Sequence, residues 1–261
     1  MCRWLAYAGE SRPIEKFVYD DPHSLCSQAR QSHKAKLGVH GDGGGLGWYG
    51  ATEEPGLYRR SGPAWADVNL RDLTRVVESR VFFAHVRAST GAPNIDINCH
   101  PFRADSFLFM HNGQIGGFSQ LRRRLTDALT DESYDALLGG TDSELLFQLM
   151  ITHGLRDDAE QAIRDTIIAV DTMRKRDGIT EAFRATLAIT DGENIWALRW
   201  SSDDYAPSLY LTEKQGGALV VSEPLDENTS SWKKVPPDSL VRIGLRANRV
   251  SIDHRQSFIN G

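Results

Sequence analysis

The first residues of the chain, Met1-Cys2-Arg3-Trp4-Leu5, place a cysteine directly behind the initiator methionine. Met1 is normally trimmed when the next side chain is small, and trimming would leave Cys2 with both a thiol and a free α-amine. A thiol is a strong nucleophile once it is ionised, and an α-amine with a pKa of about 7.7–8.0 is partly a free base near neutral pH. One residue could therefore supply both a nucleophile and a base. A cysteine at this place also suits the start of a strand.

The composition describes an ordinary soluble globular protein. The chain has 261 residues, of which 40% are hydrophobic and 25% are charged, enough for one large domain or two small ones. The net charge of −5, without a long basic run, argues against nucleic-acid binding. No stretch approaches the roughly 20 apolar residues of a membrane span, and the N-terminus does not resemble a secretory signal. The three cysteines form no CxxC pair, so we expect a reduced, cytoplasmic protein.

The hydrophobic pattern predicts strands first, helices in the middle and strands at the end. Alternating or continuous apolar runs predict strands at 3–8, 46–50, 81–86, 106–110, 185–190, 194–200, 208–212, 218–222, 239–244 and 248–253. Helical spacing or capping residues predict helices at 23–36, at 70–77 with Asn69 as cap, and around 118–129, 145–149 and 163–173. No linker-like tract divides the chain. We therefore expect a single α+β domain over 1–261, with two sheets and covering helices.

Two motifs offer groups that suit an amide substrate. Arg87 follows the apolar strand 81–86, and its planar fork can hold a carboxylate in two places, with the Thr90 hydroxyl close by. A surface arginine with any acidic neighbour is the alternative. The Asn112 side-chain amide and the Gly113 backbone N–H could point two donors at one oxyanion. A simple Asn-Gly turn is the alternative there.

Two further motifs have a structural and a functional reading. His100 lies in the loop Asn98-Cys99-His100-Pro101-Phe102, but His85, His100 and His111 do not have a recognised zinc-ligand spacing, so we expect no metal. Thr141-Asp142-Ser143-Glu144 fits a capping box in front of a helix, with Thr141 as cap and Glu144 reaching back. Asp142 could be the cap itself, or it could hold a substrate ammonium.

The glycine-rich stretch 41–50 needs a separate interpretation. Residues 45–50, Gly-Leu-Gly-Trp-Tyr-Gly, match GxGxxG literally, but they do not open a helix as a dinucleotide-binding motif would. We expect a loop that needs close backbone approach and positive φ angles, leading into a strand. Such a loop could flank a substrate pocket.

Taken together and in this order, these motifs resemble the class II glutamine amidotransferases of the N-terminal-nucleophile superfamily. The similarity runs from Met1-Cys2-Arg3 to Thr141-Asp142-Ser143-Glu144 and so spans the first 150 residues. Ser222-Glu223-Pro224-Leu225 resembles the stand-alone members, including the γ-glutamyl hydrolase of ergothioneine synthesis. The resemblance implies a four-layer αββα sandwich of two mainly antiparallel sheets. It implies no cofactor.

The resemblance also implies roles for individual residues. Cys2 would be the nucleophile that attacks the side-chain amide carbon of glutamine, and Asn112 with Gly113 would form the oxyanion hole. Four residues would bind the substrate: Arg87 and Thr90 its α-carboxylate, Asp142 its α-ammonium, and His100 the wall of the glutamine pocket.

Two departures from the family pattern leave the reaction open. Large members carry a tryptophan after the pocket arginine, where this chain has Ala88, and no synthase or sugar-isomerase domain is found in the sequence. A separate synthase subunit would then receive the ammonia, or the enzyme would hydrolyse a γ-glutamyl conjugate for its own sake. If Met1 were retained, the α-amine would be lost as a base, and a non-enzymatic scaffold or regulatory subunit would be the third reading.

Overall fold

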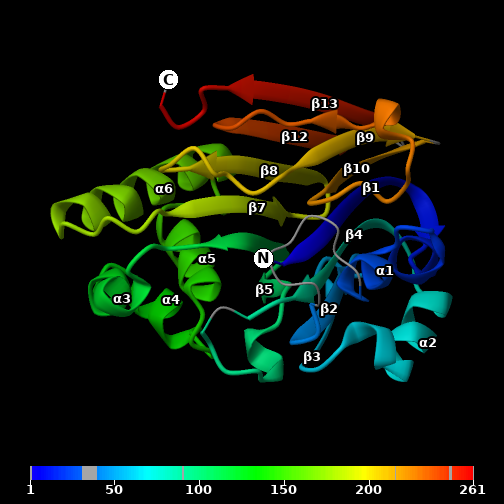
Figure 1. Ribbon diagram of the computed structural model, residues 1–261, viewed down its shortest axis with the longest axis horizontal. Coiled ribbons are helices and arrows are strands. Elements are labelled where there is room, and N and C mark those ends of the chain that lie inside the picture. The colour runs from blue at the N-terminus through cyan, green and yellow to red at the C-terminus, as the bar shows by residue number, and fades with distance from the viewer. Residues whose placement is uncertain (1, 31–39, 90, 215, 247–248, 261) are drawn as a thin grey trace.

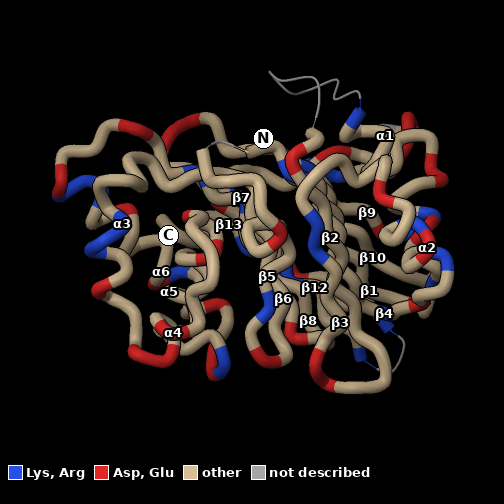
Figure 2. Tube along the Cα trace, turned by 90° about the horizontal axis from the view of Figure 1, so that it is seen from below, with Lys and Arg blue, Asp and Glu red and all other residues tan. Residues whose placement is uncertain are grey.

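Two antiparallel sheets lie face to face in the computed structural model, and helices cover both outer faces (Figure 1). The structure describes residues 2–30, 40–89, 91–214, 216–246 and 249–260. Viewed from below, four layers follow one another: a layer of helices, the two sheets and a second layer of helices (Figure 2). The expected four-layer αββα sandwich is therefore confirmed.

The first sheet has seven strands in the order β11-β9-β10-β1-β4-β2-β3. Its strands are β1 (Arg3–Pro13), β2 (Gly43–Trp48), β3 (Gly56–Arg60), β4 (Glu78–Arg87), β9 (Tyr210–Lys214), β10 (Gly217–Val221) and β11 (Lys233–Lys234). The N-terminal strand β1 is central, because it pairs with β10 on one side and β4 on the other.

The second sheet has six strands in the order β13-β12-β8-β7-β6-β5. Its strands are β5 (Phe102–Ala104), β6 (Phe107–Gln114), β7 (Arg184–Thr190), β8 (Asn194–Ser201), β12 (Ser239–Arg246) and β13 (Arg249–Gln256). The α-helices are α1 (Leu25–Arg30), α2 (Val68–Val76), α3 (Phe118–Asp127), α4 (Asp131–Asp135), α5 (Asp142–Thr152) and α6 (Ala159–Arg176). None of the described helices is both long and apolar enough to cross a membrane.

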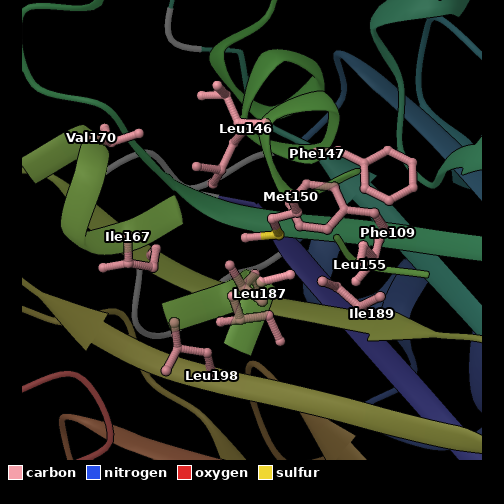
Figure 3. Packing of buried hydrophobic residues seen from close by; sticks show 14 of the residues in the cluster. Phe109, Leu146, Phe147, Met150, Leu155, Ile167, Val170, Leu187, Ile189 and Leu198 are labelled. Carbon is pink, nitrogen blue, oxygen red and sulfur yellow. The ribbon is translucent and has the colours of Figure 1, made fainter. Parts of the chain in front are cut away.

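Period-2 alternation in the strands divides the interior into three apolar layers. On β1, Leu5 and Tyr7 pack under α1 and α2, while Trp4 and Ala6 face the other sheet. The third layer lies between the second sheet and α3, α5 and α6. Figure 3 shows its packing, where Phe109 of β6 lies against Phe147 of α5. A strand whose two faces are both covered needs apolar residues throughout, which explains the continuous run in β4.

The strand predicted at 46–50 is present but begins earlier, since β2 spans Gly43–Trp48, and glycines that were expected in a loop are part of this strand. Glycine is needed here because neighbours come close to the strand. A Cβ on Gly45 would lie 2.2 Å from the carbonyl oxygen of His100 and 2.8 Å from that of Tyr58. The glycines therefore serve tight packing of an extended strand.

Two local predictions also need correction, and a third is tested only in part. Asn112-Gly113 is not a turn, because both residues lie inside β6 and pair with Thr186 and Ala185. The cap of α2 is Asp67, whose carboxylate accepts the backbone N–H groups of Asn69 and Leu70 at 3.1 Å. The first helix, α1, spans Leu25–Arg30, and the rest of its predicted extent, residues 31–36, lies outside the described residues.

Candidate active site

A cleft of about 750 Å³ opens where the ends of β1, β4 and β6 meet the N-terminus of α5. Six of the seven residues selected from the sequence line it: Cys2, Arg87, His100, Asn112, Gly113 and Asp142. The seventh, Thr90, lies outside the described residues.

Strand register explains why residues far apart in sequence meet here. Arg3 pairs with Val86 across β1 and β4, so Cys2 and Arg87 end neighbouring strands. Alternation then sets their direction. Leu108 and Met110 of β6 face the space between the sheets, and Asn112 continues that face. The cleft is thus the polar end of the layer between the two sheets.

Cys2 lies at the floor of this cleft. Its thiol is 3.6 Å from the carbonyl oxygen of Ala88, to which it donates. Burial raises the pKa of the Cys2 thiol, and the positive charge of Arg87 opposes that rise only in part. Because a thiol with a raised pKa is almost entirely protonated near neutral pH, Cys2 needs a nearby base to act as a nucleophile.

The Arg87 guanidinium is buried and held by the loop that follows it. Its N–H groups donate to Asn94 Oδ1 at 2.8 Å, to Ser89 Oγ at 3.2 Å and to the Ala92 carbonyl at 3.2 Å. Asp42 fixes this loop by accepting from Ser89 N at 2.7 Å and from Asn94 Nδ2 at 3.1 Å. The arrangement positions a rigid cation at one wall of the cleft.

Asp142 provides the opposite charge from the first turn of α5. Its Oδ2 accepts the backbone N–H of Ile115 at 2.9 Å, which fixes the carboxylate beside the end of β6. Thr141 is the cap, as its hydroxyl accepts Glu144 N at 3.0 Å. The other half of the predicted capping box is wrong: the Glu144 carboxylate accepts from Leu138 N and Gly139 N, holding the preceding loop.

Asn112 and Gly113 lie side by side on β6 at the cleft. The Asn112 side chain is 2% exposed, and its Oδ1 has no hydrogen-bond partner among the described residues. Position 113 requires glycine, because a Cβ there would lie 1.9 Å from the Arg184 carbonyl oxygen and 2.6 Å from His111 Nε2. A buried amide oxygen without a partner is costly, which points to a ligand that donates a hydrogen bond to it.

Buried histidines lie at the cleft, and His100 and His111 line it. The rings of His85 and His100 stack with centroids 4.3 Å apart, and no described residue bonds their nitrogens. Burial lowers the pKa of His85 to about 3 and holds that of His100 well below its usual range. Both are therefore neutral rings at neutral pH. No three His, Cys, Asp or Glu residues in the described parts of the chain form a group that could hold a metal.

His111, on the outer face of β6, has a defined tautomer. Its Nε2 lies 3.1 Å from the Arg184 carbonyl and must donate to it, so Nδ1 accepts from the Ser143 hydroxyl at 2.9 Å. Burial lowers the pKa of His111, although Asp142 opposes the shift. The histidine thereby locks the start of α5 against the strand that carries Asn112.

Sequence reasoning missed two residues that connect the walls of the cleft. Asn98 is 1% exposed and bridges two loops: its Nδ2 donates to the Pro93 carbonyl at 2.9 Å, and its Oδ1 accepts Gly140 N at 3.1 Å. Asp42 organises the loop beside Arg87. The signal for Asn98 was its place in the Asn-Cys-His-Pro motif, and the signal for Asp42 was an acidic residue among glycines.

Comparisons with known proteins agree with this architecture. The family model described as "Glutamine amidotransferases class-II" matches residues 17–209. The Saccharomyces cerevisiae protein named "Probable glutamine amidotransferase DUG3" is 30% identical, over 93% of this chain and 82% of its own length. A glutamine aminotransferase class-II domain protein from Silicibacter pomeroyi is 35% identical with a TM-score of 0.76, covering 97% of this chain and 98% of its own.

A more distant structure supports the fold alone. The glutamine phosphoribosylpyrophosphate amidotransferase of B. subtilis is 16% identical with a TM-score of 0.65, covering 97% of this chain and 49% of its own. The two antiparallel sheets thus match the N-terminal-nucleophile type of fold. The extent of the family match and the identity to its relatives lead to one conclusion: this chain belongs to the class II glutamine amidotransferases.

Proposed function

We propose that the protein is a cysteine amidohydrolase that cleaves the γ-amide of glutamine to glutamate and ammonia. The supporting observation is that Cys2, Arg87, Asn112 and Asp142 converge on one cleft in a member of this family. Each group has a chemistry that an amide-bearing amino acid requires: a nucleophile, a cation, an amide donor and an anion.

The proposed reaction begins after removal of Met1. The α-amine of Cys2, acting through a water molecule, takes the thiol proton, and the thiolate attacks the amide carbon. The negative charge that develops on the amide oxygen is stabilised by the Asn112 amide and the Gly113 N–H. Collapse of this intermediate breaks the C–N bond, the protonated amine gives its proton to the departing nitrogen, and ammonia leaves. Water then hydrolyses the γ-glutamyl thioester and releases glutamate.

Substrate selection follows from the charges at the two walls. Arg87 is proposed to bind the α-carboxylate and Asp142 the α-ammonium, with His100 shaping the pocket and Thr90 beside the carboxylate. A substrate that lacks either charge would leave a buried partner uncompensated and bind poorly. We expect such selection to appear mainly in kcat/KM.

A γ-glutamyl amide with a larger amine is the second candidate. The cleft, at about 750 Å³, is of the size that holds drug-sized ligands, about 300–1,000 Å³. It continues along the start of α3, where Phe118, Ser119 and Arg122 line it. The small Ala88 and the Ser222-Glu223-Pro224-Leu225 motif, which resembles the ergothioneine-type γ-glutamyl hydrolase, favour the same candidate.

We propose that the protein works in the cytoplasm. Cys2, Cys26 and Cys99 are free thiols, as suits a reducing cytoplasm. We propose that residues 1–261 act as one domain. Ammonia from glutamine would pass to a separate synthase subunit, whereas hydrolysis of a γ-glutamyl conjugate would need no such partner.

Turnover by protein with Cys2 as its first residue tests the proposal. Glutamine and a series of γ-glutamyl amides of increasing size are supplied, and release of glutamate and of the amine is measured. Faster turnover of glutamine supports the glutaminase, and faster turnover of a larger amide supports the second candidate. If no compound is cleaved, and a Cys2→Ala variant complements a knockout as well as wild type, the chain is a scaffold.

A further inference from the structure

The segment directly after β10 holds the N-terminal strand next to the nucleophile. Ser222 N donates to the Trp4 carbonyl at 3.0 Å, and Trp4 N donates to Ser222 Oγ at 3.0 Å. Gln28 of α1 secures the following backbone by donating to the carbonyls of Glu223 at 3.2 Å and Pro224 at 3.1 Å. Residues 222–224 are thus a fixed part of the site, although they lie 220 residues away in sequence from Cys2 and its neighbours.

Glu223 forms a buried ion pair with Arg3. Arg3 Nε lies 2.8 Å from Glu223 Oε2, and the two side chains are 3% and 11% exposed. Arg3 also donates through NH1 to the carbonyl oxygen of Cys2 at 3.1 Å. The guanidinium therefore connects the Glu223 carboxylate directly to the backbone of the proposed nucleophile. Arginine suits this place because its rigid fork can serve both partners at once.

Several charged or titratable groups surround residue 2. Arg3 lies on its own strand, Arg87 on β4, Asp142 on α5, and His40 with Asp42 in the segment before β2. His40 is buried, its ring nitrogens have no hydrogen-bond partner among the described residues, and burial together with the Arg3 charge lowers its pKa to about 4. His40 is thus neutral at neutral pH, and the charge balance at Cys2 depends on the arginines and the carboxylates.

We propose that Arg3 and Glu223 are a positioning pair for the nucleophile, which fixes the backbone of Cys2 and sets how readily its α-amine takes up a proton. The inference rests on the proposed role of Cys2 as an N-terminal nucleophile. Arg3 disfavours a second positive charge next to it, and Glu223 offsets this effect. The pair therefore keeps the amine close to its ordinary basicity while the Cys2 carbonyl is held in place.

Substitution of Arg3 and substitution of Glu223 should have opposite effects on the protonation of the Cys2 α-amine. Glu223→Gln leaves the Arg3 charge unopposed, so the amine should lose its proton more easily, and the acid limb of the kcat/KM profile should move to lower pH. Arg3→Met leaves the Glu223 carboxylate, so the limb should move to higher pH. The expected displacement is on the order of one pH unit in each direction. Arg3→Met/Glu223→Met removes both charges and should return the limb close to wild type, with a lower kcat.

A second readout does not depend on turnover. In protein labelled with ¹³C-cysteine and prepared with Cys2 first, the Cys2 signals follow the protonation of its amine and thiol. Cys26 is the internal reference between pH 5 and 9, because burial raises the pKa of its thiol to about 12, whereas Cys99 interacts electrostatically with Cys2. Glu10→Gln is the matched charge control: it removes an exposed carboxylate at the far end of β1 and should leave the Cys2 titration unchanged.

The outcomes separate the two proposals. Opposite displacements of the Cys2 titration in Glu223→Gln and Arg3→Met, with restoration in the double variant, support the positioning pair. Unmoved titrations with uniformly lower rates overturn it and leave these residues a structural role only. If Arg3→Met does not fold, Glu223→Gln and the double variant still decide. A wild-type protein without turnover contradicts the proposed function, while the NMR titration continues to test the pair.

Discussion

The layer between the two sheets has an apolar middle and a polar end. In the middle, Trp4, Phe83 and Met110 are fully buried and pack against side chains of the opposite sheet. At the end, Cys2 and Asn112 continue the same strands on the same faces, but they line a cleft. The two regions share one backbone geometry and differ only in the chemistry of their side chains.

This difference separates stability from function. Burial of apolar side chains in the middle supplies stabilising free energy. At the end, buried polar atoms such as Asn112 Oδ1 and the ring nitrogens of His85 and His100 have no partner among the described residues. Each such group costs roughly 1–3 kcal/mol. The apolar middle thus compensates for the cost of the polar site. Substitutions in the middle should therefore change the free energy of unfolding, and substitutions at the polar end should change the activity.

The largest effect is expected at Cys2. Cys2→Ala should lower kcat/KM by about 10⁴-fold or more, because Cys2 carries the only thiol among the described residues that line the cleft. The midpoint of urea unfolding should stay close to that of wild type, since the only hydrogen bond of the side chain to a described residue is the one to Ala88. Activity that persists in Cys2→Ala would contradict the proposal that catalysis depends on the polar end of the layer.

The middle of the layer should respond in the opposite way. Phe83→Ala removes a fully buried ring and should lower the free energy of unfolding by about 3–5 kcal/mol. The kcat of the protein that remains folded should change only a few-fold. Val76→Ala on α2 is the control, because Val76 is 77% exposed and its loss should change stability by less than about 0.5 kcal/mol.

Asn112 tests the polar end without removing the nucleophile. Asn112→Ala should lower kcat by about 10²–10³-fold, corresponding to about 2.7–4 kcal/mol of lost transition-state stabilisation. Unfolding should be unaffected or slightly harder, because a buried oxygen without a described partner is removed. A decrease of less than tenfold in kcat would argue that the oxyanion is stabilised elsewhere.

We expect low pH to lower the free energy of unfolding, because His85 and His40 are buried as neutral rings. Burial lowers the pKa of His85 to about 3 and that of His40 to about 4, so the unfolded chain binds protons before the folded chain does. Stability is therefore complete above pH 6.5 and is lost between pH 6.5 and these folded-state pKa values, by about 1.4 kcal/mol per pH unit for each histidine. Urea midpoints at several pH values measure the slope.

Substitution of His85 tests whether this histidine causes the loss of stability in acid. His85→Phe keeps a planar ring against His100. It should reduce the dependence of the free energy of unfolding on pH by the contribution of one histidine. An unchanged slope would mean that His85 is not held neutral in the folded protein. The effect per pH unit is smaller than those of the three substitutions above.

The apolar middle could be predicted from the sequence better than the polar end. Strand positions such as 81–86 and 185–190 followed from hydrophobic runs, and β4 and β7 contain them. The glycine-rich start of strand β2 was missed, because the need for glycine at position 45 comes from the His100 backbone, which sequence reasoning cannot place. A local sequence pattern reflects the residues of the strand itself. It does not reveal which residue of another segment packs against that strand.

The residues of the candidate active site also differ in how well the sequence predicts them. Arg87 and Asn112 were predicted because they end apolar strands, where functional groups collect. Asn98 was missed because its role is to connect two loops, at Pro93 and Gly140, whose proximity depends on the whole fold. A turn was the alternative interpretation of the Asn-Gly pair in β6, because that is the commonest local use of this pair.

Intact mass after treatment with a glutamine-analogue electrophile tests the central claim most directly, that Cys2 is the nucleophile of this cleft once Met1 is removed. Protein with Cys2 first should gain one adduct, mapped to Cys2 and suppressed by excess glutamine or γ-glutamyl amide, while protein that retains Met1 should react far more slowly. Folded, Met1-free protein that gains no adduct, or that gains it at Cys26 or Cys99, would contradict the claim.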